Sequence, residues 1–137
     1  MTMKKTLTLA LLALSTACGG SDDETSSPAV VCDAGTTIAI AAPGAAPACI
    51  RAAPSATVTI TNPRATTVEI RSNPHPTHGS CPEIDATAPI PAGGSVAVVM
   101  ITVGTCRFHD HADGTPVGII QVGSGTPTPV PEPPGGY

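Results

Sequence analysis

The sequence predicts an all-β protein folded as a β-sandwich, and three observations support this prediction. Apolar and polar side chains alternate with a period of two across much of residues 32–122, as in strands with one buried face. Proline and glycine punctuate the gaps between the alternating segments. Beyond residues 1–17, no stretch shows the 3.6-residue apolar stripe of an amphipathic helix. An immunoglobulin-like sandwich is compatible with the same pattern.

The predicted strands follow one another at short intervals along the chain. They span residues 36–40, 57–61, 66–71, 95–103 and 117–122. In the second segment Val58 and Ile60 are expected to face the core. In the third, Val68 and Ile70 are expected to do so. Several short strands separated by turn residues are typical of a sandwich with a modest core.

The start of the chain has the features of a secretory signal. Residues 1–17 join a basic start, a short apolar run and small residues, and the run is too short to span a bilayer. The segment from Ser15 to Cys18 resembles the bacterial lipobox, in which the cysteine is diacylated and becomes the mature N-terminus. It departs from that pattern at one position. The lipobox usually has a leucine three residues before the cysteine, where this chain has Ser15, and the nearest leucine is Leu14, one residue too early. Cleavage after Ala17 as an ordinary signal peptide would instead leave Cys18 free.

The regions flanking the predicted domain are compositionally simple. The lipidated Cys18 and residues 19–31 form a polar acidic tether, and residues 123–137 form a Pro-rich tail expected to be extended. Gly19, rather than an aspartate, follows the cysteine, and resemblance to lipoprotein sorting rules implies the outer membrane. We therefore expect a bacterial envelope lipoprotein facing the periplasm or the cell surface, with the lipid as its only membrane contact.

The charge of the chain argues against one class of partner. Once residues 1–17 are removed, four arginines and no lysine remain against ten carboxylates, which gives a formal charge of −6. A protein that binds nucleic acid needs a basic surface, so this charge does not favour such binding.

The number of cysteines predicts two disulfides. If Cys18 carries lipid, four cysteines are left in an oxidising compartment. Of the three possible pairings we prefer Cys32–Cys49 with Cys81–Cys106, because the first pair brackets one hairpin-like stretch.

All four histidines of the chain fall into two tight clusters. The first is His75-Pro76-Thr77-His78 and the second is His109-Asp110-His111. Imidazole is the commonest protein ligand for copper and zinc, and residues at i and i+2 of a strand share a face. We therefore predict a metal site formed by His75, His78, His109 and His111, with Asp110 pointing away from it.

The order of these motifs resembles the cupredoxins, the small blue-copper proteins, over residues 55–122. In that family one histidine ligand follows a middle strand, and the other ligands lie between the last two strands. The best match is a bacterial group with an early His-Pro-x-His and a late Tyr-His-Asp-His, which correspond here to residues 75–78 and 108–111. The resemblance implies a Greek-key β-sandwich with copper as the cofactor.

Two alignments of the late motif give different chemistry. In one, Cys106 is a thiolate ligand of a blue copper centre. In the other, Asp110 occupies the position of the ligand cysteine and Cys106 belongs to the core. We favour the second, because a thiolate at Cys106 would leave Cys81 as an odd thiol. Which of His75 and His78 binds the metal is left open.

The predicted function is copper binding by an exported lipoprotein, with electron transfer to a redox protein partner as a possibility. The alternative is a metal-free, disulfide-stapled structural or adhesive module of the envelope. No nucleophile–base signature or phosphate-binding loop indicates an enzyme. Glu83 and Asp85 are interpreted as surface loop carboxylates.

Overall fold

Residues 30–123 fold into two β-sheets packed face to face with one short helix. The computed structural model describes residues 30–123. The predicted signal peptide, Cys18, most of the tether and the tail from residue 124 lie outside the described residues. The elements are β1 (Asp33–Ala34), β2 (Thr37–Ile40), β3 (Ala45–Ala46), β4 (Cys49–Ala52), β5 (Thr57–Thr61), β6 (Ile70–Ser72), α1 (Pro82–Asp85), β7 (Ser95–Val99), β8 (Gly104–Asp110) and β9 (Pro116–Val122).

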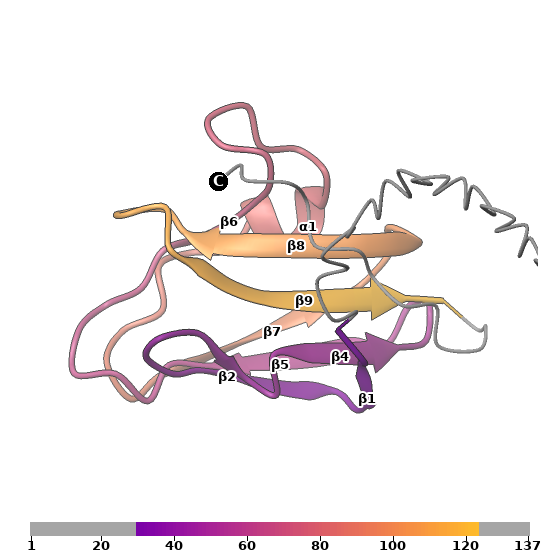
Figure 1. Ribbon diagram of the computed structural model, residues 1–137, viewed down its shortest axis with the longest axis horizontal. Coiled ribbons are helices and arrows are strands. Elements are labelled where there is room, and N and C mark those ends of the chain that lie inside the picture. The colour runs from indigo at the N-terminus through magenta and orange to yellow at the C-terminus, as the bar shows by residue number, and fades with distance from the viewer. Residues whose placement is uncertain (1–29, 124–137) are drawn as a thin grey trace, which may run out of the picture.

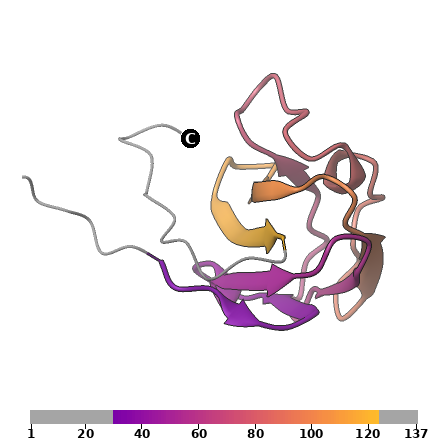
Figure 2. The same cartoon turned by 90° about the vertical axis from the view of Figure 1, so that its right-hand side faces the viewer.

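The two sheets are both mixed. One has the strand order β1-β4-β9-β8-β6 and the other β3-β2-β5-β7. Within them β1–β4, β4–β9 and β2–β5 are parallel pairs, and the remaining pairs are antiparallel. Figures 1 and 2 show β8 and β9 side by side above the layer that contains β2, β5 and β7. The all-β sandwich predicted from the period-two pattern is confirmed.

Alternate strand residues from the two sheets fill the core between them. Ile38, Ile40, Val58 and Ile60 of β2 and β5 are fully buried, as the period of two requires. Phe108 is the largest buried side chain, and its ring packs over Gly118. A Cβ at that glycine would lie 3.1 Å from Phe108 Cζ and 2.9 Å from Ile38 Cδ1. Gly118 is therefore required by close packing between the sheets.

Two disulfides cross-link the described residues, and both match the predicted pairing. Cys32–Cys49 links the segment before β1 to the start of β4, and the β2–β3 hairpin lies between the two cysteines. Cys81–Cys106 links the residue before α1 to the middle of β8. The second bond therefore fastens the loop between β6 and α1 to the neighbouring strand.

The ends of the predicted strands differ from the ends of the observed strands. The segment predicted at 66–71 contributes an isolated bridge between Val68 and Ile90, and β6 begins at Ile70. The long segment predicted at 95–103 leaves the sheet at Val99, because Glu83 accepts the backbone N–H groups of Ile101 and Thr102. Strand β4, which includes a disulfide cysteine, was not among the predicted strands.

Helix α1 was also not predicted, because a single turn of four residues is too short to show a helical apolar stripe. It begins at Pro82, directly after the disulfide, and buries Ile84 against the core. Among the described residues, no helix has the length and apolar character needed to cross a membrane.

Candidate metal centre

The fold brings the two histidine clusters to one end of the sandwich. His75 and His78 lie in the loop between β6 and α1, which projects from the sandwich in Figures 1 and 2. His109 lies in β8, and His111 lies in the turn that follows it. Because β6 pairs antiparallel with the end of β8, with Arg71 opposite His109, the loop leaves β6 beside the second cluster.

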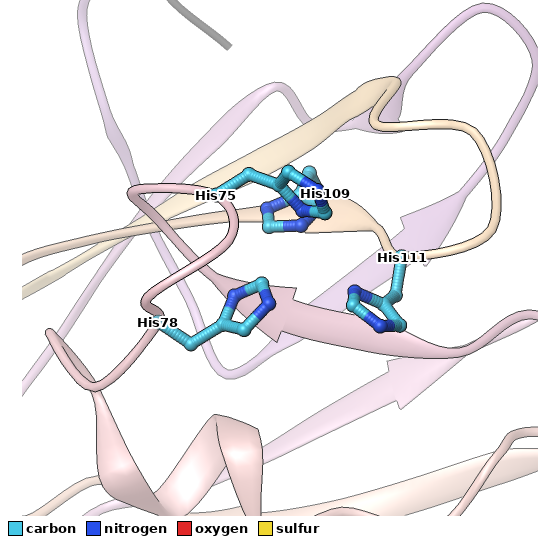
Figure 3. A group of neighbouring side chains, drawn as sticks. All are labelled: His75, His78, His109 and His111. Atoms are coloured by element: carbon cyan, nitrogen blue, oxygen red, sulfur yellow. The ribbon is translucent and has the colours of Figure 1, made fainter.

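The four imidazole rings face a common centre. One ring nitrogen of each histidine lies within 4.8 Å of the corresponding nitrogen of every other. The six distances between ring centroids run from 5.0 to 6.1 Å. Figure 3 shows the rings turned toward one another from the loop and from the end of β8. All four predicted residues are therefore brought together, including both His75 and His78.

Burial differs among the four rings. His109 is only 1% exposed, His78 and His111 are half-buried, and His75 is exposed. Burial, and after it the charges of the neighbouring His78, His75 and His111, lowers the pKa of His109 below its ordinary value. The buried imidazole is therefore neutral around pH 7, which is the form that binds metal ions.

Hydrogen bonds fix the orientation of two of the rings. His78 Nδ1 lies 2.8 Å from the carbonyl oxygen of Ser72, and His109 Nδ1 lies 2.7 Å from Asn73 Oδ1. Because both oxygens accept hydrogen bonds, each Nδ1 carries the proton of the neutral ring. The lone pair of each neutral ring is then on Nε2, which faces the centre of the cluster.

The nitrogen atoms that face the centre lack other partners. Among the described residues, His78 Nε2, His109 Nε2 and His111 Nδ1 are buried polar atoms without a hydrogen bond. Buried polar atoms are normally hydrogen-bonded, and three such atoms at one point are unusual. A bound metal ion would satisfy all three, so the residues present fit a metal.

The region around Asp110 departs from a regular strand. The pairing of β8 with β9 shifts register between Phe108 and His109, and β8 ends at Asp110. The Asp110 carboxylate turns away from the histidines, as predicted, and forms an ion pair with Arg64 at 3.1 Å. Asp113 accepts a hydrogen bond from the backbone N–H of Thr115 and closes the turn. Neither carboxylate belongs to the four-residue cluster.

The structure also bears on the alternative in which Cys106 is a thiolate ligand. Cys106 is bonded to Cys81 and is fully buried in the core. The donor set of the cluster is therefore four imidazoles without a thiolate. A set of nitrogen donors suits Cu(II) or Zn(II).

Several residues that support the cluster were not found from the sequence. Ser72 and Asn73 hold the two ring nitrogens, and Asp85 in turn accepts hydrogen bonds from Ser72. Asp85 and Glu83 were interpreted as surface loop carboxylates, and this interpretation was wrong. Both lie on α1, are half-buried and accept backbone hydrogen bonds. Adjacency to the first histidine cluster was the only sequence signal for Ser72 and Asn73, and Asp85 had none.

No family model matches the chain, and no curated protein sequence matches it significantly. Among solved structures, the fold is similar to a purple cupredoxin from Nitrosopumilus maritimus, with a TM-score of 0.51 and 18% sequence identity. That similarity covers 64% of this chain and 99% of that chain. A reduced amicyanin variant gives a TM-score of 0.50 at 15% identity, covering 72% of this chain and 94% of that chain.

A copper-containing nitrite reductase from Thermus scotoductus SA-01 is also similar, with a TM-score of 0.50 and 13% identity. The similarity covers 66% of this chain but only 23% of the reductase. These three similarities concern the fold. They show that the sandwich has a cupredoxin-like fold.

Proposed function

We propose that this chain is a copper-binding protein that holds one copper ion with His75, His78, His109 and His111. One observation carries the proposal: four imidazole nitrogens lie within 4.8 Å of one another, and three buried ring nitrogens have no hydrogen bond. The proton positions set by Ser72 and Asn73 leave the lone pairs of His78 and His109 available to the ion.

Copper is favoured over other metals by the donor set and by the fold. Copper binds nitrogen donors more tightly than the other divalent first-row metals do. The nitrite reductase of similar fold is named as copper-containing, and the similar amicyanin structure was determined in a reduced state. Within residues 30–123 the single methionine is Met100, which is fully buried in the hydrophobic core, so this part of the chain supplies no thioether to the cluster. A soft, sulfur-based Cu(I) site is therefore not supported.

Electron transfer to a redox protein is a narrower form of the same proposal. The thiolate of a blue copper site helps to tune its potential, and here Cys106 is held in a disulfide. We therefore place copper binding first and one-electron transfer second. A pale Cu(II) complex is expected. An intense blue colour would indicate a thiolate ligand and would make electron transfer the better-supported function.

The proposal is tested by titrating the purified protein with Cu(II) and measuring bound copper after dialysis. We expect about one equivalent, with an electron paramagnetic resonance spectrum typical of nitrogen ligands. The variant His109→Ala, His111→Ala should lose the ion. Thr77→Ala is the matched control, because Thr77 lies between His75 and His78 in the same loop and is exposed. If the unsubstituted protein retains no copper after dialysis, the metal-free structural module becomes the better explanation.

We further propose that the protein is exported and anchored to the bacterial outer membrane through Cys18. The support is the lipobox-like segment together with two disulfides, which form and persist in oxidising compartments. Labelling cells with a radioactive fatty acid should mark the unsubstituted protein. Cys18→Ser should abolish the label and release the protein from the membrane fraction. Labelling that survives this substitution would overturn the anchor.

A further inference from the structure

The loop that carries His75 and His78 is held at several points by backbone hydrogen bonds. Asn73 N donates to the carbonyl oxygen of Arg107 in β8 at the start of the loop. His78 N donates to the carbonyl oxygen of Pro74 at 2.7 Å, which closes a turn around His75. At the far end, Cys81 is fastened to β8 by its disulfide. The loop therefore has fixed ends and a folded middle.

Ser72 connects this loop to the rest of the protein. Its carbonyl oxygen accepts the hydrogen bond from His78 Nδ1, and its hydroxyl oxygen accepts the N–H groups of Gly79 and Cys81. Ser72 is fully buried, so its polar atoms depend on partners within the protein. The position of the His78 ring is therefore tied to the position of Ser72.

Asp85 is the partner that holds Ser72. Asp85 Oδ1 accepts the backbone N–H of Ser72 at 2.6 Å, and Oδ2 accepts the Ser72 hydroxyl at 2.8 Å. Oδ2 also accepts the backbone N–H of Gly79 at 2.9 Å. The Asp85 carboxylate therefore binds the loop at Ser72, before the two histidines, and at Gly79, after them.

The backbone between these anchor points is in an unfavourable conformation. His78 has φ = +52° and Gly79 has φ = +90°, so two consecutive residues occupy positive φ. Glycine tolerates this region, but a residue with a Cβ rarely adopts it without support from its surroundings. The hydrogen bond from Gly79 to Asp85 lies directly after His78, where such support is needed.

We infer that Asp85 is a positioning residue of the metal centre, which fixes the loop of His75 and His78 through Ser72 and Gly79. This inference rests on the proposed function, because it concerns how the same four imidazoles are held for copper. Asp85 acts through other residues and is not itself a member of the cluster. The outer partners of metal-binding histidines typically change metal affinity by about tenfold to a hundredfold when they are removed.

Helix α1 offers a matched control for Asp85. Glu83 lies two residues earlier on the same single turn and is also half-buried. It likewise accepts two backbone N–H groups and one hydroxyl, from Ile101 and Thr102. Those partners lie after β7 and carry no histidine. Removing either carboxylate takes away the same number and kind of hydrogen bonds, so the loss of stability should be similar for the two residues.

The experiment compares Asp85→Ala and Glu83→Ala with the unsubstituted protein. Copper affinity is measured by competition with a chelator of known affinity, and unfolding midpoints are measured on the copper-free proteins. Proton and nitrogen NMR of the copper-free proteins reports which nitrogen of His78 carries the proton. We expect Asp85→Ala to bind Cu(II) about tenfold to a hundredfold more weakly, to alter the resonance spectrum of bound copper and to change the His78 signals. Glu83→Ala should leave the copper affinity, the resonance spectrum and the His78 signals unchanged while lowering the unfolding midpoint.

A variant that keeps the size and shape of the side chain but removes its charge provides a second check if Asp85→Ala is too unstable to purify. Asp85→Asn keeps one carbonyl oxygen that can accept from Ser72 but replaces the other acceptor with a donor. It should give a smaller loss of copper affinity in the same direction. If neither substitution at Asp85 alters copper affinity or the His78 signals beyond the effect of Glu83→Ala, the assignment to Asp85 is wrong. Failure of the unsubstituted protein to bind copper would instead overturn the proposed function itself.

Discussion

The two disulfides allow stability and metal binding to be separated by a paired experiment. Cys81–Cys106 joins residues 25 apart in the sequence, and Cys32–Cys49 joins residues 17 apart. In the loop-entropy relation, these separations correspond to about 3.5 and about 3.1 kcal/mol of stabilisation at 25 °C. Replacing either pair by alanine should therefore lower the free energy of unfolding of the copper-free protein by nearly the same amount.

Copper binding should respond to only one of the two replacements. Cys81 ends the loop that holds His75 and His78. The bond between Cys32 and Cys49 instead lies at the start of β4, and two strands, β9 and β8, separate β4 from β6, where that loop begins. Urea unfolding of the copper-free proteins measures stability, and competition with a chelator measures copper affinity under conditions where both variants are folded. We expect weaker copper binding only in the variant lacking Cys81 and Cys106. Equal copper affinity in the two variants would refute the idea that this bond organises the metal centre.

Three further predictions concern the stability of the fold rather than the metal centre. Asn62 is fully buried and donates to the carbonyl oxygens of Thr66, Ile90 and Pro91, so Asn62→Ala should destabilise the protein by at least about 2 kcal/mol in urea unfolding. Gly118→Ala should cost about 1–3 kcal/mol in the same assay, because its Cβ would overlap the packed core. Burial alone would raise the pKa of Glu83, but hydrogen bonds from Thr102 and Ile101 outweigh it and lower the pKa below 4.5. The carboxylate therefore stabilises the fold above about pH 4.5, and this contribution is lost as the pH falls through the lowered value. The unfolding midpoints of Glu83→Gln and the unsubstituted protein should differ at neutral pH and converge in acid; a constant difference would contradict this explanation.

The parts of the site that could be predicted from the sequence depend on short-range patterns. Each histidine pair lies within four residues, so either cluster is visible without knowledge of the fold. Counting cysteines favoured a Cys81–Cys106 bond over a thiolate, since a ligand role for Cys106 would have left an odd thiol. In the same way, the alternation of Val58 and Ile60 identified a strand from its own residues.

What could not be predicted depends on contacts between distant segments. Asp85 reaches Ser72 across thirteen residues of sequence, and the loop between them has no periodicity that fixes where it folds. Residues 101–103 continue the apolar alternation of β7, but Glu83 takes the backbone N–H groups of Ile101 and Thr102 and ends the strand. In both cases a side chain competes with the sheet for backbone hydrogen bonds, and such competition leaves no signal in a pattern of apolar residues.

The accessibility of the histidine cluster bears on the proposed copper-binding function. A cleft of about 390 Å³, lined by His75, His111 and residues 112–114, opens beside the cluster, and His75 is exposed. An ion could enter from this side and meet His75 and His111 before the buried ring of His109, which gives the site an entry path. A site for uptake needs such an opening and does not need a thiolate, whereas a blue-copper electron carrier depends on one. The exposed His75 and the disulfide at Cys106 therefore both agree with the proposed order of functions, in which binding of the ion comes before electron transfer.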